Sequence, residues 1–181
     1  MTYPLILFDL GDTLMSEETE QKDGDGVTLT ADLVPGMADL VRGLTDAGVQ
    51  LGLVADTRIG TYQHVLRQHD LDDLFAHVAI SEELGITKPH PEMFLSVVRQ
   101  GGSAPSDALI VGNNDARDIE GAYACGLATL WFRWNDRYPT PRLPRAATYV
   151  ATTSDEVKAA IALWLRSHSC RVSRHDPLLN I

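Results

Sequence analysis

The sequence predicts an α/β protein whose mostly parallel central sheet is covered by helices on both faces. Two observations support this fold class. Short apolar runs alternate along the chain with amphipathic stretches of helical spacing, and turn-forming Gly, Asp and Pro residues separate the two kinds of segment. Repeated strand–helix units of this length give parallel strands and place ligands at the carboxyl edge of the sheet.

The first half of the chain supplies three of these units. Leu5–Phe8 is an apolar run that ends at Asp9, and it predicts a buried strand. The acidic, Gly-rich stretch from Ser16 to Thr30 predicts an exposed loop or loose hairpin. Further along, the apolar spacing predicts helices at about 37–47 and 61–69, and strands at 51–55 and 78–80.

The second half continues the alternation. We expect helices at about 91–100 and 115–125, and strands at 108–111 and 128–132. Trp134 to Pro144 contains three prolines and is expected to be a surface loop. The pattern Thr153-x-x-Glu156 is typical of a capping box, and it opens a helix with one apolar face.

One domain accounts for most of the chain. Its 181 residues compare with roughly 150 residues for a typical domain. We assign residues 1–165 to this domain, with 17–30 as a flap over its surface. The last residues, 166–181, lack apolar periodicity and are expected to form a mobile tail or an arm that docks on a partner.

Composition excludes several classes of protein. Apolar residues make up 44% and charged residues 22%, so neither disorder nor a coiled coil explains the chain. The formal net charge of −10 would repel a nucleic-acid backbone. No apolar run approaches the ~20 residues that span a bilayer, and the first residues do not form a signal peptide. We therefore expect a cytoplasmic protein that binds neither nucleic acid nor membranes.

Polar side chains gather where the predicted strands end. Asp9 follows the first strand, Asp56 and Thr57 follow the second, and Asn113 and Asp118 follow the fourth. Carboxylate and amide oxygens suit a hard cation such as Mg²⁺, which keeps several waters and binds phosphate oxygens. A lysine before the helix at 91–100 would add positive charge for the same phosphate.

Three segments in this order resemble motifs of the haloacid dehalogenase-like (HAD) hydrolase superfamily. The resemblance extends from residue 5 to about residue 132, and it implies a three-layer α/β/α Rossmann-like HAD fold. The segments are Phe8-Asp9-Leu10-Gly11-Asp12-Thr13-Leu14, Lys88-Pro89-His90-Pro91-Glu92-Met93-Phe94, and Val111-Gly112-Asn113-Asn114-Asp115-Ala116-Arg117-Asp118-Ile119.

The resemblance also implies a chemistry, that of a Mg²⁺-dependent phosphatase. Asp9 would attack phosphorus to form an aspartyl-phosphate, and Lys88 would orient Asp9 and offset charge in the transition state. Thr57, or the backbone around Asp56, would hold a phosphate oxygen of the phosphorylated substrate. The implied magnesium ligands are Asp9, the backbone carbonyl of Gly11 and Asn113, with Asp118 as a further ligand or as a neighbour that supports them.

Three positions depart from the superfamily pattern. Gly11 stands where phosphatases carry a second Asp, the general acid, and Asp12 comes one position later and is expected to point elsewhere. Ala55 replaces a Ser or Thr, and Asn113 replaces an Asp. Since general acid catalysis is worth about 10²–10⁴-fold, we expect slow chemistry or chemistry selective for good leaving groups.

These departures keep two other functions open. One is a 2-haloacid dehalogenase-like hydrolase, whose relatives also lack the second Asp, and the other is a non-catalytic protein that binds a phosphorylated ligand or a protein partner. The insertions between the motifs are too short for a cap domain. The site is therefore expected to be open, covered by a large substrate, by a second copy of the chain, or by the flap. The acidic run at Glu17 and Glu18 is expected to be a solvated face rather than a substitute acid.

Overall fold

A six-stranded, entirely parallel sheet forms the centre of the protein. The computed structural model describes residues 4–135, 137 and 145–169. The strand order is β5-β4-β1-β6-β7-β8, so β1 lies between β4 and β6 in the middle of the sheet. The predicted fold class is confirmed. The strands are β1 (Leu5–Phe8), β4 (Gln50–Ala55), β5 (His77–Ile80), β6 (Ala108–Gly112), β7 (Ala128–Phe132) and β8 (Tyr149–Ala151).

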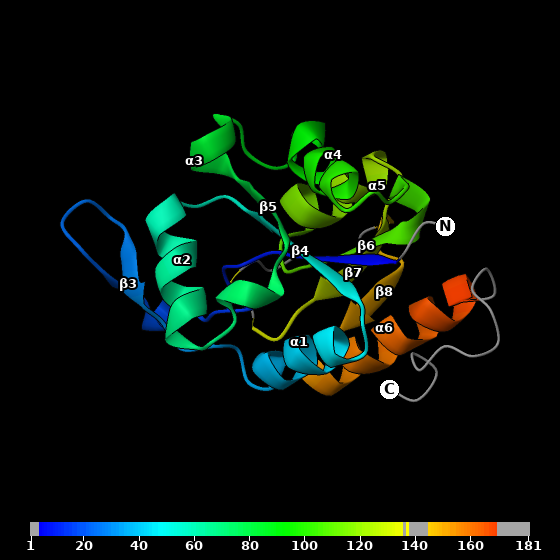
Figure 1. Cartoon of the computed structure of the whole chain (residues 1–181), viewed down its shortest axis with the longest axis horizontal. Coiled ribbons are helices and arrows are strands. Elements are labelled where there is room, and N and C mark those ends of the chain that lie inside the picture. Colours follow the sequence, from blue (N-terminus) through cyan, green and yellow to red (C-terminus); the bar gives the residue numbers. More distant parts are fainter. Residues whose placement is uncertain (1–3, 136, 138–144, 170–181) are drawn as a thin grey trace.

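Helices cover both faces of this sheet (Figure 1). One face carries α4 (Pro91–Gln100) and α5 (Glu120–Ala124), and the other carries α1 (Met37–Asp46) and α6 (Ser154–Ser169). The remaining helices are α2 (Ile59–Gln68) and the short α3 (Ser81–Leu84). Among the described residues, no helix combines the length and the apolar character needed to cross a membrane.

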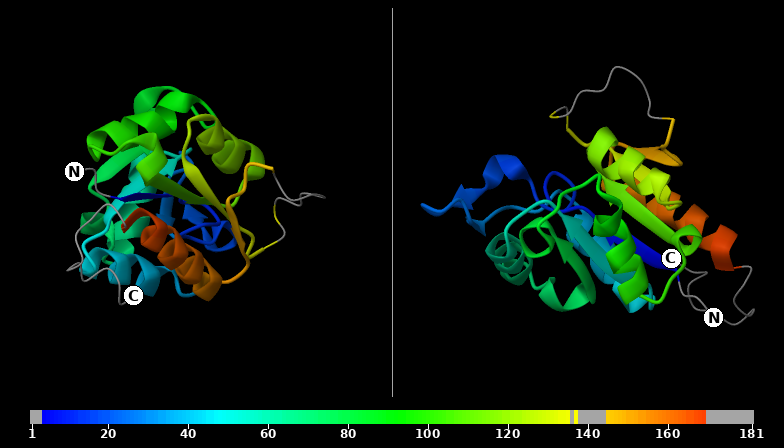
Figure 2. Two further views of the ribbon diagram at one scale, coloured as in Figure 1. Left: turned by 90° about the vertical axis from the view of Figure 1, so that its right-hand side faces the viewer. Right: turned by 90° about the horizontal axis from the view of Figure 1, so that it is seen from above.

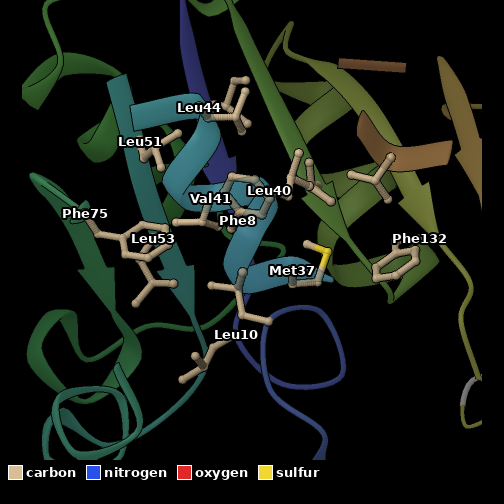
Figure 3. Packing of buried hydrophobic residues seen from close by; sticks show 14 of the residues in the cluster. Phe8, Leu10, Met37, Leu40, Val41, Leu44, Leu51, Leu53, Phe75 and Phe132 are labelled. Carbon is tan, nitrogen blue, oxygen red and sulfur yellow. The ribbon is translucent and has the colours of Figure 1, made fainter. Parts of the chain in front are cut away.

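The central strand β1 has apolar side chains on both of its faces, as expected of a parallel strand between two helical layers. Ile6 and Phe8 belong to the cluster on the side of α1 and α6, and Leu5 and Leu7 belong to the cluster on the side of α4. Figure 3 shows Phe8 beside the apolar face of α1. This packing fixes where β1 ends within the sheet. It therefore also fixes the position of the next residue, Asp9.

Three elements differ from the sequence-based expectation. The strand β8 was not predicted, because its three residues are too few to show a pattern. The helix expected at 115–125 begins instead as a π-helical turn, Asp115–Ile119, before α5 continues. Helix α6 runs to Ser169, past the expected domain boundary at 165, while residues 170–181 of the expected tail lie outside the described part of the chain.

The capping box at the start of α6 is formed with one change. The backbone N–H of Glu156 donates to Oγ1 of Thr153 at 3.2 Å, as the pattern predicts. The Glu156 carboxylate accepts from the backbone N–H and the hydroxyl of Thr152, one residue before the expected partner.

The stretch expected to form a flap is a small hairpin. A 3₁₀ turn at Glu17–Thr19 leads into the antiparallel strands β2 (Gln21–Lys22) and β3 (Thr28–Thr30). The hairpin packs against α2, where the backbone N–H of Thr28 donates to Oγ1 of Thr61 at 3.0 Å. Figure 2 shows the hairpin projecting from the body of the protein. Between β1 and β4 the described chain holds this hairpin and α1, with no cap domain.

Candidate functional site

The sequence-predicted site residues line a single cavity of about 180 Å³ at the carboxyl edge of the sheet. Three adjacent parallel strands, β4, β1 and β6, end at this edge. The chain runs from β1 to β4 and β5 on one side of β1 and then crosses back to β6 on the other side. Such a point is the usual ligand site of an open parallel sheet. The predicted residues around the cavity are Asp9, Gly11, Asp56, Thr57, Lys88, Asn113 and Asp118.

Lys88 lies at the centre of the charged groups. Its side chain is 4% exposed, and Nζ donates to Oδ1 of Asp9 at 2.5 Å and to the Val54 carbonyl at 3.1 Å. The same nitrogen pairs with Oδ1 of Asp118 at 2.7 Å. Burial opposes the charge on Lys88, but the two carboxylates outweigh it and raise its pKa above the usual value. Lys88 is therefore a fixed cation between two acids.

Asp9 is held from several directions. Its backbone N–H donates to the Val111 carbonyl at 3.0 Å, and Oδ2 accepts from Oγ1 of Thr13 at 3.1 Å. Burial raises the pKa of Asp9 to about 7, with Lys88 opposing the rise and Asp118 adding to it. Burial thus disfavours the charged form of this carboxyl group, and the contact with Lys88 favours it.

The loop after β6 positions Asp118 and Asn113. Oδ2 of Asp118 accepts from the backbone N–H of Asn114 at 3.0 Å, and a Cβ at position 112 would overlap the Asp118 side chain, so Gly112 allows this close approach. The Asn113 carbonyl accepts from Nε1 of Trp131 at 2.9 Å. The Asn113 side-chain nitrogen is buried and has no hydrogen-bond partner among the described residues. A buried amide left unpaired is costly, so this group is placed to meet a ligand.

Asp56 supports the site through two contacts. Oδ1 accepts from the backbone N–H of Lys88 at 2.9 Å, and Oδ2 pairs with the Arg117 guanidinium at 2.9 Å. Arg117 also lines the cavity, although the sequence reasoning did not single it out. Its position within a helical stretch does not indicate this ion pair, because the contact depends on how the loops after β4 and β6, on either side of β1, come together at the edge of the sheet.

A second group of residues holds the loop after β1 from outside the cavity. Asp12 is fully buried and does not line the cavity, as expected. Its carboxylate pairs with Arg137, and its carbonyl accepts from Nε1 of Trp134 at 2.8 Å. Oδ1 of Asp12 also accepts from the backbone N–H of Glu17 at 3.0 Å. Sequence reasoning missed the roles of Arg137 and Trp134. The only feature of the sequence that could have indicated a contact there is Trp134, an aromatic residue in the loop that follows β7.

The oxygen donors around the cavity fit a hard divalent cation. Asp9 offers a carboxylate, Asn113 an amide oxygen and Gly11 a backbone carbonyl, and all three residues line the cavity. Among the residues that the structure describes, no three Asp, Glu, His or Cys side chains form a ready-made metal cluster. Both oxygens of Asp118 are engaged, by Lys88 and by Asn114. The donor set thus suits a divalent cation that takes few protein ligands and retains water.

Comparison with known families gives one clear match. The family model described as haloacid dehalogenase-like hydrolase matches residues 18–132, which is more than half of the chain. The match begins after Asp9 and includes Lys88, Asn113 and Asp118.

Several curated relatives are phosphatases by name. The chain is 34% identical to the glyceraldehyde 3-phosphate phosphatase of Pyrococcus abyssi over 102 residues, or 56% of this chain and 42% of that protein. It is 38% identical to the phosphoserine phosphatase of Thermus thermophilus over 73 residues, or 40% of this chain and 28% of that protein. The chain thus spans less than half the length of these relatives.

Solved structures share the fold at low identity. A HAD phosphatase from Thermococcus onnurineus superposes with a TM-score of 0.73 at 19% identity, covering 89% of this chain and 98% of that chain. A HAD family hydrolase from Deinococcus radiodurans, solved with bound phosphate and sodium, gives a TM-score of 0.71 at 20% identity, covering 90% and 96% of the two chains.

Proposed function

Since the chain belongs to the haloacid dehalogenase-like hydrolase family, we propose that it hydrolyses phosphate monoesters through an aspartyl-phosphate on Asp9. The observation that carries the proposal is the contact between Lys88 and Asp9 inside the cavity. A buried cation holds one oxygen of a buried carboxylate, which orients the other oxygen for attack on an electrophile. The phosphatase names of the curated relatives support the same chemistry.

The reaction would proceed in two steps. Lys88 holds Oδ1 of Asp9, so Oδ2 is the attacking oxygen; a bond forms between Oδ2 and phosphorus as the ester P–O bond breaks. The leaving alkoxide takes a proton and departs. A water molecule then attacks the aspartyl-phosphate, which releases inorganic phosphate and regenerates Asp9. Through both steps Lys88 offsets the negative charge that develops near Asp9.

Three neighbouring groups are suited to hold the phosphoryl oxygens. The unpaired side-chain nitrogen of Asn113 can donate one hydrogen bond into the cavity. Arg117, which Asp56 holds at the cavity, adds a positive charge. Thr57 lines the same wall and offers a hydroxyl. In this assignment Asp56 acts mainly by placing Arg117 and Lys88, because both of its oxygens are engaged.

Mg²⁺ would be held by Asp9, the Gly11 carbonyl and Asn113. When bound, the ion would neutralise charge between the carboxylate and the phosphate and polarise the phosphoryl group. Asp118 would fix Lys88 rather than contact the ion directly, because its two oxygens bond to Lys88 and to the Asn114 backbone.

A small phosphorylated molecule suits the surroundings of the cavity. A wider hollow of about 650 Å³ adjoins it and shares Lys22, Thr57 and Arg117 with it, so the leaving group would extend there. Glu17, Glu20 and Lys22 bring the hairpin segment to the rim of the cavity. The hairpin thus provides part of the cover over an otherwise open site, and a second copy of the chain would be a further source of cover.

The proposal is tested by release of p-nitrophenol from p-nitrophenyl phosphate. We expect turnover by the wild type with Mg²⁺, none with a chelator, and a loss of about 10³-fold or more in Asp9→Asn, which lacks the nucleophile. Binding of inorganic phosphate without turnover of any phosphate ester would instead favour a non-catalytic ligand-binding protein. Metal-independent halide release from a 2-haloacid would favour the dehalogenase.

A further inference from the structure

The side chain of Glu17 occupies the space above Gly11. A Cβ atom at position 11 would overlap Oε1 of Glu17 and would lie 3.1 Å from its Cδ. Glu17 and Gly11 both line the cavity that contains Asp9. A carboxyl group therefore lies beside the backbone two residues after Asp9, although no side chain is attached there. It comes from a residue six positions further along the chain.

Contacts from two sides hold Glu17 in this position. Its backbone N–H donates to Oδ1 of Asp12 at 3.0 Å. Its Oε2 pairs with Nη1 of Arg137 at 3.4 Å, and Arg137 also pairs with Asp12. Oε2 thus pairs with Arg137, and Oε1 is the oxygen that lies beside Gly11. Glu17 is half-buried, so it differs from the exposed Glu18 beside it and from the solvated face that the acidic run suggested.

The other carboxylates that line the cavity each bind a neighbouring group. Asp9 and Asp118 share Lys88. Asp56 binds Arg117 and the Lys88 backbone. Glu20 accepts from the Thr28 hydroxyl at 2.6 Å and pairs with Lys22 at 2.9 Å. Glu17 is thus the cavity-lining carboxyl group with an oxygen directed over the loop that carries the nucleophile.

We propose that Glu17 is the general acid of the reaction, and that it protonates the leaving-group oxygen. This inference rests on the proposed function. As the Oδ2–P bond forms and the ester P–O bond breaks, the proton on the Glu17 carboxyl group passes to the departing alkoxide oxygen, which leaves as a neutral alcohol. Glu17 becomes a carboxylate and takes a proton back from the water that attacks the aspartyl-phosphate. Protons and electrons balance over the two steps.

Loss of a general acid should affect the hydrolysis of different phosphate esters to different degrees, according to their leaving groups. An alkoxide is a strong base and needs a proton as it departs, whereas p-nitrophenolate departs without one. Glu17→Gln keeps the size and hydrogen-bonding capacity of the side chain but cannot donate a carboxyl proton. We expect it to lower kcat for an alkyl phosphate such as glycerol phosphate by about 10²-fold or more. Hydrolysis of p-nitrophenyl phosphate should change by less than about threefold.

Two further variants make the test specific. Glu18→Gln changes the exposed neighbour of Glu17 and should leave kcat unchanged for both substrates. The double variant Gly11→Asp/Glu17→Ala moves the carboxyl group onto position 11 after the overlapping side chain has been removed, and it should restore much of the alkyl phosphatase activity.

The inference and the proposed function fail in different ways. Wild-type turnover of p-nitrophenyl phosphate that is lost in Asp9→Asn supports the phosphatase whatever Glu17 does. The role of Glu17 would be overturned if Glu17→Gln lowered kcat equally for alkyl and aryl phosphates. It would also be overturned if the variant lowered kcat for neither. A wild type that hydrolyses only the aryl phosphate would also overturn it. Inorganic phosphate binding by Glu17→Gln, measured by calorimetry, checks that the site remains folded.

Discussion

The strand β1 and the loop that follows it are adjacent in the chain but are stabilised in opposite ways. All four residues of β1 are apolar and fully buried, and their partners are apolar side chains of the neighbouring strands and helices. The next residues include two buried acids, Asp9 and Asp12, whose charged partners are Lys88 and Arg137. The strand contributes stability through burial of apolar side chains, whereas the loop places charged side chains where few water molecules can solvate them.

This difference shows where the protein gives up stability for a functional site. Burying apolar surface is favourable, at roughly 25 cal/mol per Å². Burying charges is costly, and their mutual attraction often does no more than offset the cost. The group of Asp9, Lys88 and Asp118 is therefore poorly explained as a device for stability. It is better explained by the chemistry that a buried, oriented carboxylate can perform.

The largest effect is expected from removing the cation that the two acids share. Lys88→Met would leave Asp9 and Asp118 buried without their common partner. We expect a loss of about 3–5 kcal/mol in the free energy of unfolding at pH 8, measured by urea denaturation, together with loss of turnover. Part of the stability should return near pH 5, because one of the two carboxyl groups can then be protonated.

Lys158→Met supplies the matched control for this variant. Lys158 is an exposed residue of α6, so the same substitution there should change stability by no more than about 0.5 kcal/mol. Equal losses in both variants would mean that the buried position of Lys88 has no special role.

A much smaller effect is expected from the apolar region. Ile161 is a buried residue of α6 in the same cluster as Phe8. Ile161→Val removes one methylene group and should lower the free energy of unfolding by about 0.5–1.5 kcal/mol, with kcat unchanged. A change in kcat beyond about twofold would indicate that the packing of this face reaches the site, which would weaken the contrast between the two regions.

The sequence predicted the part of the site that depends on regular structure. Because parallel strands end at one edge, the positions of Asp9, Asp56 and Asn113 after their strands were enough to predict that they lie together. The HAD-like motifs added Lys88 and Asp118. All of these residues line the cavity. The fold class followed from the same alternation of strands and helices.

The part that was missed depends on contacts between distant loops. Arg137 and Trp134 reach the loop after β1 across more than 120 residues, and nothing in the spacing of a Pro-rich loop predicts that contact. Glu17 looked like one residue of an acidic, solvated run, and its approach to Gly11 depends on the turn that Asp12 stabilises. The strand β8 was missed because three residues at a sheet edge carry too little pattern.

Replacement of Asp9 tests most directly whether the site lowers the stability of the folded protein. The pKa of Asp9 is raised to about 7 in the folded protein, from an ordinary value of 3.8. Between these values the folded state binds more protons than the unfolded state, so ionisation of Asp9 lowers the free energy of unfolding as pH rises from about 4 to about 7. Asp9→Asn lacks this titration.

The decisive measurement is the free energy of unfolding of the wild type and Asp9→Asn, by urea denaturation with a chelator present, at pH 5 and pH 8. We predict that the variant is inactive, and that its stability relative to the wild type is higher at pH 8 than at pH 5. A variant whose relative stability is lower at pH 8 than at pH 5 would contradict the account. It would mean that the ionised Asp9 stabilises the fold and that its pairing with Lys88 is structural.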